Sequence, residues 1–417
     1  MIRFILIFFL FIFSCGKKDD FVDIESFINQ GKKINLVDRK NLNSQEISKI
    51  KLLETFNYTI YKNWSQSNQN SKNYIKPTKV FIEKKNRQIS KKTNEFIIYD
   101  NKIITIDSKS NIAIYSLDLQ KINSKKIYKR KIYKNYNINF SIIAYKNTLY
   151  ISDNLGNIHS LNIKNLELNW KKSFGVPFRS NLKIHQNNLF IINSNSKIFS
   201  ISINNGNLNW SFETSSKKLK DELSYQIAIY DNKLFFTNDS FEIYCLDLVE
   251  KNIKWSLIFD NENFENSPII SRSSPISIDE NGILYISSNN GSTYSIDSNT
   301  GLLKWSAPIY STNRFVFSKN HLFNVFENYI FIINRKNGKI LMNKEILSKR
   351  KNEKFLFKDI LINPSSIYLF DINGYLITIN KSDLSKYKVN KYYKKYSDLI
   401  IINDSLYINT GDAIYRY

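Results

Sequence analysis

Apolar and polar residues alternate along short stretches of this chain, and the stretches recur. Four segments align without gaps, each an alternating run, a polar turn and a second run that ends in Trp. They end at Trp170, Trp210, Trp255 and Trp305, and the residue eight positions before each Trp is Asn162, Ser202, Asp247 or Asp297, respectively. Alternation with a period of two, interrupted by turn residues, predicts antiparallel β-strands rather than helices.

Weaker copies of the segment place Asp118, Asn334 and Asn380 at the same position, and the average spacing of these positions is about 44 residues. A repeat of this length built of strands is typical of the blades of a β-propeller. We expect four strands in each blade. In the third unit they are residues 181–184, 189–193, 197–203 and 208–212.

The recurring residues have structural explanations. An Asp or Asn side chain can accept hydrogen bonds from the turn backbone, and Gly tolerates the positive φ that hairpin turns require. An indole can pack on the neighbouring blade and donate its N–H. We therefore expect structural rather than functional roles for Trp170, Trp210, Trp255, Trp305, Asp247, Asp297 and Gly301.

The last unit has strands at residues 399–402, 406–409 and 413–417 but no fourth strand. Residues 78–84 (TKVFIEK) alternate as a strand does and precede the first full unit, which starts at Phe96. If this segment supplies the missing outer strand, the ring closes and no long sheet edge stays open. Seven complete blades and one shared blade predict an all-β, eight-bladed propeller at residues 61–417. A seven-bladed ring is the alternative.

The N-terminus has the features of a targeting signal. In residues 1–14, Arg3 precedes an apolar run of about ten residues, which suits a signal peptide and is too short to span a membrane. Residues 12–15 (IFSC) resemble a bacterial lipobox, in which the thiol of Cys15 would take the lipid. Gly16 follows, which resembles the outer-membrane address of proteobacterial lipoproteins. We expect residues 15–60 to be a lipidated N-terminus and a tether.

Composition narrows the function further. Hydrophobic residues make up 42% of the chain, so it can bury a core. Two Cys and three His argue against a disulfide framework or a zinc site. The net charge of +23 indicates either a surface for nucleic acid or anionic membranes, or a compositional bias that spreads Lys over the whole chain. A lipidated envelope protein would not meet nucleic acid, so we expect no such partner.

Residues 295–305 (SIDSNTGLLKW) match the PQQ-type propeller repeat, in which a strand leads to Asp, Thr-Gly, three residues and Trp. Residues 63–66 (NWSQ) resemble the segment that precedes the first blade in bacterial members. With the lipobox and the tether, the chain resembles the BamB family of propeller lipoproteins, over about residues 60–417 and the signal. The resemblance implies a non-enzymatic scaffold without a cofactor, held by lipid at the periplasmic face of the bacterial outer membrane, that aids assembly of β-barrel proteins.

The resemblance also implies the partners: the periplasmic domains of the central barrel-insertion protein and other assembly subunits, bound by one face of a monomeric propeller. In the family, a loop on that face carries an Arg just before a strand. The matching loops are residues 177–180 (PFRS) and 271–275 (SRSSP), so Phe178, Arg179 and Arg272 are candidate partner-binding residues. Family members often have acidic residues before the second strand, where this chain has Ser271 and Arg272.

Two other functions stay open. A PQQ-dependent dehydrogenase on the same fold needs a calcium ion held by carboxylate and amide oxygens, an Asp base and typically a vicinal Cys pair. Here Cys15 and Cys245 are far apart, and no metal motif, phosphate loop or nucleophile–base pair stands out. A propeller that binds another envelope protein or a polysaccharide would carry the same sequence features.

Overall fold

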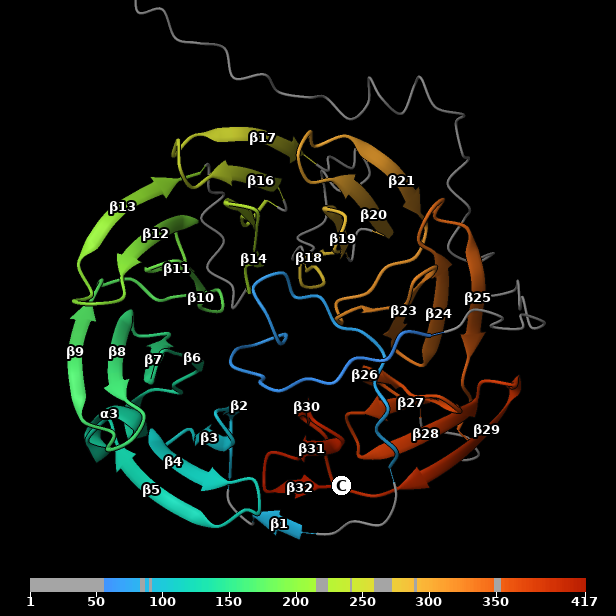
Figure 1. Cartoon of the computed structure of the whole chain (residues 1–417), viewed down its shortest axis with the longest axis horizontal. Coiled ribbons are helices and arrows are strands. Elements are labelled where there is room, and N and C mark those ends of the chain that lie inside the picture. The colour runs from blue at the N-terminus through green and yellow to red at the C-terminus, as the bar shows by residue number, and fades with distance from the viewer. Residues whose placement is uncertain are drawn as a thin grey trace, which may run out of the picture.

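The molecule is a ring of eight four-stranded antiparallel sheets (Figure 1). The structure is a computed structural model that describes residues 56–82, 87–89, 92–214, 224–240, 242–258, 272–288, 291–348 and 354–417. The prediction of an all-β, eight-bladed propeller is confirmed. The signal sequence and Cys15 lie outside the described residues.

The first four blades follow the chain from the N-terminal side. Blade 1 contains β2 (Glu95–Tyr99), β3 (Lys102–Ile106), β4 (Asn111–Ser116) and β5 (Lys121–Lys126). Blade 2 contains β6 (Phe140–Tyr145), β7 (Thr148–Asp153), β8 (Asn157–Asn162) and β9 (Leu168–Ser173). Blade 3 contains β10 (Lys183–His185), β11 (Asn188–Ile192), β12 (Lys197–Ser202) and β13 (Leu208–Glu213). Blade 4 contains β14 (Ile227–Tyr230), β15 (Lys233–Thr237), β16 (Glu242–Asp247) and β17 (Ile253–Ile258).

The other four blades complete the ring. Blade 5 contains β18 (Ser277–Ile278), β19 (Ile283–Ser288), β20 (Ser292–Asp297) and β21 (Leu303–Ala307). Blade 6 contains β22 (Val316–Phe317), β23 (His321–Phe326), β24 (Tyr329–Asn334) and β25 (Ile340–Glu345). Blade 7 contains β26 (Phe357–Ile362), β27 (Ser366–Asp371), β28 (Tyr375–Asn380) and β29 (Asp383–Lys391). Blade 8 contains β30 (Asp398–Ile402), β31 (Ser405–Asn409), β32 (Ile414–Arg416) and β1 (Arg87–Ile89). A short helix, α3 (Arg130–Asn135), connects blades 1 and 2.

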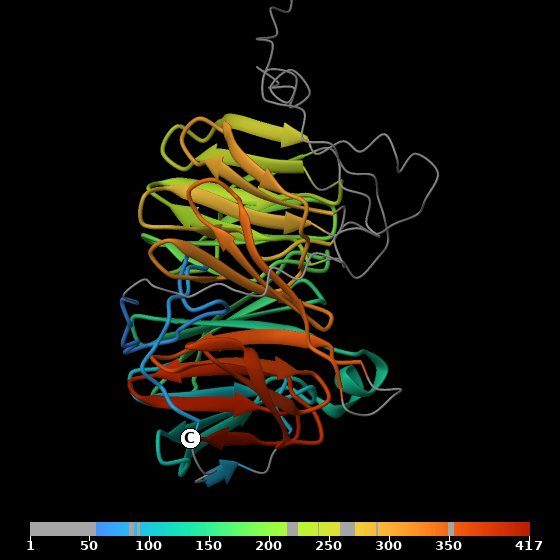
Figure 2. The ribbon, with the colours of Figure 1, turned by 90° about the vertical axis from the view of Figure 1, so that its right-hand side faces the viewer.

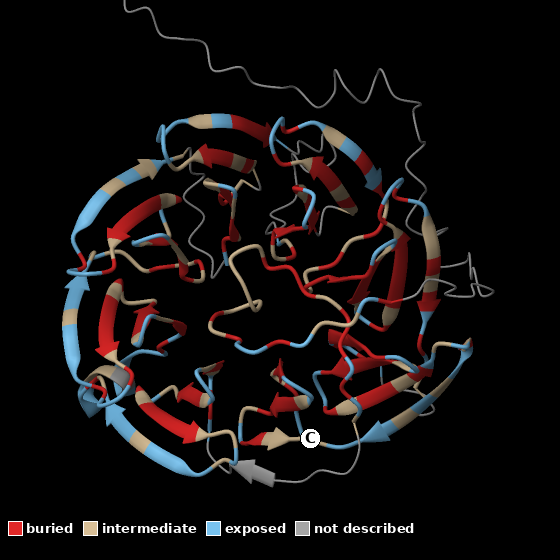
Figure 3. Cartoon of the chain, in the orientation of Figure 1, coloured by how far each residue is buried: buried red, intermediate tan, exposed pale blue. Residues whose placement is uncertain are grey.

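The middle strands of each blade are buried on both faces because each blade packs between two others. In β12 the four central residues are all buried, and β7, β23 and β27 show the same pattern over most of their length. The outer strands of blades 1–3 face solvent instead: β5, β9 and β13 are exposed at most positions (Figure 3). Ile, Phe and Tyr suit such half-buried and fully buried strands, which explains why these types dominate the repeats.

The ring is closed by an N-terminal strand, as expected, but the residues differ from the prediction. β1 pairs with β32 in the register Arg87↔Arg416 and Ile89↔Ile414. The segment expected to do this, residues 78–84, was assigned wrongly. Thr78 instead donates its N–H to the Ile362 carbonyl of blade 7, at the inner edge of the sheet, and Val80 is buried there.

Residues 56–82 form a segment that runs through the middle of the ring (Figure 1). We call it the axial segment. It touches every blade, largely in chain order. Its hydrogen bonds join Tyr61 O to Asn403 N of blade 8, Trp64 to Ile98 of blade 1, Ser65 O to Ala144 N of blade 2, Ser67 O to Lys183 Nζ of blade 3, Ser71 O to Ile229 N of blade 4, Lys72 O to Ile278 N of blade 5, Ile75 O to Phe317 N of blade 6, and Thr78 N to Ile362 O of blade 7.

These bonds satisfy the innermost strand edges, which would otherwise present unpaired backbone groups to the channel. Lys183 is the strongest side-chain anchor of the segment. It is 1% exposed, and its ammonium donates to Asn70 O at 2.9 Å and to Asn73 Oδ1 at 2.6 Å. Burial lowers the pKa of Lys183 to about 7. The channel is therefore filled by the chain's own N-terminal part.

Neighbouring blades are joined where an outer strand meets the turn between the third and fourth strands of the next blade. At three joints the donor is an indole N–H: Trp170 to Ile203 O at 2.9 Å, Trp255 to Ser298 O at 3.1 Å, and Trp305 to Arg335 O at 2.8 Å. The turn glycine of the next blade lies on the same ring, so that a Cβ on Gly206, Gly301 or Gly338 would approach Trp170, Trp255 or Trp305 to 2.5, 2.9 or 2.7 Å.

Three other joints use a cation in place of the indole. Lys125 Nζ donates to Leu166 O at 2.7 Å, Lys344 Nζ to Leu384 O at 3.1 Å, and Arg416 Nη1 to Leu117 O at 3.1 Å. Arg416 also pairs with Asp118 at 2.9 Å. A side-chain donor to a backbone carbonyl of the next blade thus recurs around the ring, while the donor changes and, for Arg416, comes from the third strand β32.

The antiparallel topology gives the ring two different faces. Connections from an outer strand to the next inner strand lie on one face, which we call the mouth face. The turns that begin at Asp247 and Asp297 lie on the other, which we call the turn face. Figure 2 shows α3 on the side of the mouth face and the blue axial segment toward the opposite side.

Candidate functional site

The mouth face is hollowed at the axis into a cavity of about 580 Å³. We call this cavity the funnel. Its walls come from residues that precede or begin the inner strands of every blade except blade 2. They are Glu95, Asn181, Ser224, Gln226, Arg272, Ser273, Pro275, Thr312, Asn313, Arg314, Lys358, Asp359 and Asp398.

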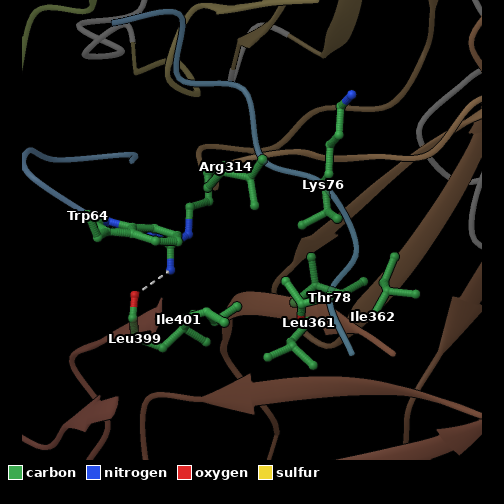
Figure 4. A pocket seen from close by; sticks show the side chains of 11 residues that line it. Trp64, Lys76, Thr78, Arg314, Leu361, Ile362, Leu399 and Ile401 are labelled. Carbon is green, nitrogen blue, oxygen red and sulfur yellow. Dashed lines mark hydrogen bonds between the residues drawn. The ribbon is translucent and has the colours of Figure 1, made fainter. Parts of the chain in front are cut away.

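The axial segment forms the floor of the funnel through Ser67 and Asn68. Arg314 connects the wall to this floor. Its guanidinium lies over the Trp64 ring at 5.7 Å, and its Nη2 donates to the Leu399 carbonyl at 3.2 Å (Figure 4). The funnel is therefore open on the mouth face and ends at the axial segment.

A buried ion-pair network holds Arg314 in place. Its Nε lies 2.5 Å from Asp359 Oδ1, and its Nη2 lies 3.2 Å from Asp398 Oδ1. Tyr396 donates its hydroxyl to the other oxygen of Asp359 at 2.6 Å. Burial alone would lower the pKa of Arg314, but Asp359 and Asp398 raise it above its usual value. Removing one partner would leave an uncompensated buried charge, so this network is rigid and costly to break.

Glu95 adds a third carboxyl to the same wall. Burial raises the pKa of Glu95 to about 8, and the nearby charge of Asp398 acts in the same direction. Lys358 opposes the shift. The wall formed by blades 1, 7 and 8 is thus rich in charge, whereas the wall formed by blades 3 and 4 carries Asn181, Ser224 and Gln226.

The structure places the three residues predicted to bind a partner in two adjoining hollows. Arg272 is exposed and lines the funnel. Arg179 lines an adjoining hollow of about 200 Å³ that shares Asn181 and Ser224 with the funnel, and its Nε is buried without a hydrogen-bond partner. Phe178 lines the same hollow as Arg179, but it is only 5% exposed and packs against Phe174 and Phe199. The two arginines therefore share the mouth face, and Phe178 supports it from inside.

The repeat residues lie away from the funnel. Asp247 Oδ1 accepts the N–H groups of Val249 and Glu250, and Asp297 Oδ1 accepts those of Asn299 and Thr300. These turns are on the turn face. Trp210 packs in the hydrophobic cluster between blades 3 and 4, with its ring 5.9 Å from Phe190.

Sequence reasoning missed Arg314, Glu95, Asp359 and Asp398. A signal for Arg314 was present, because Arg179, Arg272 and Arg314 all stand shortly before an inner strand. The carboxyl groups have no such signal, since they come from three different blades and stand in no common local sequence.

The described residues show no group of three or more His, Cys, Asp or Glu that could hold a metal ion. Cys245 is a free, buried thiol in β16, and burial raises its pKa to about 12. No helix within the described part is long and apolar enough to cross a membrane. The funnel itself is lined by charged groups and by hydrogen-bonding amides and hydroxyls.

Comparison with known proteins supports a BamB-like propeller of PQQ-type repeats. The family model described as outer membrane protein assembly factor BamB matches residues 141–344. No curated protein matches the chain. The crystal structure of BamB from Moraxella catarrhalis superposes with a TM-score of 0.65 at 14% identity, covering 80% of this chain and 99% of that one.

Other propellers are also similar in structure. A europium-containing methanol dehydrogenase gives a TM-score of 0.62 at 9% identity, covering 83% of this chain and 89% of that one. The computationally designed Ika8 protein gives 0.58 at 9% identity, covering 80% and 98%. At such identities these likenesses show the fold alone.

Proposed function

Because this chain is a BamB-like propeller of PQQ-type repeats, we propose that it is a non-enzymatic scaffold that aids the assembly of β-barrel proteins into the bacterial outer membrane. It would face the periplasm and be held to the membrane by a lipid on Cys15. Its partners would be the periplasmic domains of the barrel-insertion protein and other assembly subunits, bound by one copy of the propeller.

The observation that carries the proposal is the difference between the two faces. The axial segment closes the channel from the turn-face side, while the funnel and the hollow beside it stay open on the mouth face. Arg179 and Arg272 stand at these two openings. Arg is enriched at the energetic centres of protein interfaces because its planar group binds carboxylates and carbonyls through several N–H donors.

The test is capture of the tagged full chain from mildly solubilised envelopes, followed by mass spectrometry. The double variant Arg179→Glu with Arg272→Glu should recover about tenfold less of the barrel-assembly subunits, as expected for two interface arginines. The control, Lys336→Glu with Lys339→Glu, makes the same charge change at exposed positions of the turn face and should recover as much as the unchanged chain.

Equal losses in both double variants would refute a specific role for the mouth face. Recovery of no assembly subunit with the unchanged chain would refute the scaffold function itself. The anchor is tested separately, because Cys15→Ala should release the protein from the membrane fraction. Unchanged membrane association of that variant would refute the lipid anchor.

A further inference from the structure

The rim of the mouth face at blades 1 and 2 carries two adjoining hollows lined by cations. One, of about 740 Å³, is lined by Lys109, Lys126, Arg130 and Lys134 together with Ser108, Tyr136 and two Asn. The other, of about 420 Å³, shares Lys126 and adds Lys92, Lys121 and Lys125. We call these two hollows the basic rim. They lie around helix α3 and the end of β5, at the lower left of Figure 1.

Few carboxylates line the basic rim in the described part of the chain. Among the described residues, no carboxylate lines the larger hollow, and Asp107 is the one carboxylate that lines the smaller hollow. Asp107 is engaged in its own turn, where its Oδ1 accepts the N–H groups of Lys109 and Asn111 at 2.9 and 2.8 Å. The funnel differs, because the carboxyl groups of Glu95, Asp359 and Asp398 line it together with three cations. A chain-wide excess of Lys does not by itself produce this difference between the cavities.

Apolar side chains stand exposed beside the same cations. Tyr136, which lines the larger hollow, is 57% exposed. Ile122 follows Lys121, which lines the smaller hollow, and is 56% exposed. Figure 3 shows β5 as largely exposed. Lysines beside exposed Ile and Tyr are the composition of surfaces that lie in a membrane interface, where cations meet headgroups and apolar groups reach the acyl boundary.

We propose that the basic rim binds the anionic phosphate headgroups of a lipid bilayer and so lays this edge of the propeller on the membrane surface. Charge complementarity selects lipids with a net negative charge over zwitterionic lipids, whose phosphate is offset by a cationic group. The exposed Ile122 and Tyr136 favour a bilayer over a soluble polyanion, because only a bilayer offers an apolar environment to these side chains. This binding is separate from the partner binding assigned to Arg179 and Arg272 and does not depend on it.

The test is co-flotation of the purified full chain with vesicles of phosphatidylcholine alone or with added phosphatidylglycerol. The variant Lys109→Gln, Lys126→Gln, Arg130→Gln and Lys134→Gln should lose about tenfold or more in partitioning onto the anionic vesicles, since each basic residue near the surface contributes to attraction. The matched control replaces Lys319, Lys336, Lys339 and Lys354 by Gln, exposed lysines of blades 6 and 7. All three proteins carry the same N-terminal apolar run, so its membrane affinity cancels.

Equal losses in the two quadruple variants would overturn the proposal, because only net charge would then matter. A second variant, Ile122→Ser with Tyr136→Ser, keeps every cation. It should bind anionic vesicles several-fold more weakly while its binding to inorganic polyphosphate stays unchanged. Unaltered vesicle binding by this variant, or tighter binding of the unchanged chain to polyphosphate or single-stranded RNA than to anionic vesicles, would assign the rim to a soluble polyanion and overturn the membrane assignment.

Discussion

The two halves of the ring are held together in different ways. Blades 2–5 are joined through tryptophans and separate local clusters: each of four hydrophobic clusters fills the space between one blade and the next, up to the contact with blade 6. Blades 6, 7, 8 and 1 instead share a single cluster that includes Phe56, Tyr61 and Trp64 of the axial segment. We call these the modular half and the fused half.

The donors at the joints follow the same division. Indoles donate the hydrogen bonds at joints that begin in the modular half. At the joints that begin in the fused half, the donors are Lys344, Arg416 and Lys125. The comparison indicates that a blade can lack the Trp of its repeat when another part of the chain contributes buried apolar surface. In the fused half that part is the axial segment. The difference between the two halves can be tested by measuring how substitutions in each half change stability.

The largest effect is expected from Trp64→Ala, which removes a fully buried ring from the fused half. We expect the free energy of unfolding to fall by about 4 kcal/mol, the cost of a large cavity in a core. Denaturant unfolding measures the loss. Hydrogen exchange should show weaker protection throughout blades 6, 7, 8 and 1, and weakening confined to β2 would contradict a continuous fused half.

Trp305→Ala should cost somewhat less, about 3 kcal/mol, because Trp305 touches only the joint between blades 5 and 6. Protection should fall in those two blades alone. Trp305→Phe is the control that keeps most of the ring and removes the N–H donor, and it should cost about 1 kcal/mol. A loss of protection that spreads around the ring would show that the modular half is not modular.

Gly301→Ala tests the contact between the turn and the indole. The new Cβ would lie 2.9 Å from the Trp255 ring and would sit on a residue with φ +75°. We expect a loss of about 2 kcal/mol in thermal or denaturant unfolding, from overpacking and left-handed strain together. Gly411→Ala, at φ +80° with nothing within 4 Å, carries the backbone strain alone and should cost about half as much. Equal costs would mean that the ring contact does not matter.

Glu95→Gln should change how stability depends on pH. The pKa of Glu95 is about 8 in the folded protein, so the folded state holds a proton that the unfolded chain releases near pH 4.5. Stability of the unchanged protein should therefore fall as pH rises from about 4.5 to 8, and the variant should recover about 1 to 2 kcal/mol at pH 8. The control, exposed Glu213→Gln in the modular half, should leave the slope of stability against pH unchanged. Identical slopes in Glu95→Gln and the unchanged protein would contradict a buried charge wall in the fused half.

The smallest effect is a gain. Lys251 occupies the turn position that Gly206, Gly301 and Gly338 hold in other blades, and its φ is +58°. Lys251→Gly should raise the free energy of unfolding by about 0.5 to 1 kcal/mol, because Gly adopts this conformation without a Cβ penalty. Lys254→Gly, in the neighbouring strand β17, should destabilise instead. A destabilised Lys251→Gly would show that the Lys side chain contributes more than its backbone costs.

The sequence was most informative where side chains of adjacent repeats touch each other. Trp and Gly in the modular half make mutual contacts, so both recur and the repeat can be aligned. The donors Lys125, Lys344 and Arg416 could not be recognised, because Lys is abundant everywhere in the chain and nothing local marks these three. Residues 78–84 alternate better than Arg87–Ile89, yet the shorter segment closes the ring. The chain must first pass the inner edge of blade 7 before it reaches the outer edge of blade 8, and local pattern does not record that path.

The same reasoning explains why only some of the residues of the site could be predicted from the sequence. Arg179 and Arg272 could be singled out because they stand in similar local sequences before inner strands. The ion-pair network of Arg314, Asp359 and Asp398 is assembled from three blades and forms only when these blades have packed together. Its members are ordinary charged residues when they are considered one at a time.

The axial segment also determines when folding of the ring can be completed. It is synthesised before any blade, yet the hydrogen bonds that tie it to the ring all go to blades that are made later. β1 has to wait for β32, the last strand of the ring. While the chain is growing, the segment and the inner edges of the completed blades are therefore unpaired at the same time, which is the situation in which strand edges associate with the wrong partner. Such a chain must be kept from associating with other chains until β32 has been synthesised. Its folding rate should be governed by the long-range pairing of β1 with β32 rather than by the folding of the individual blades.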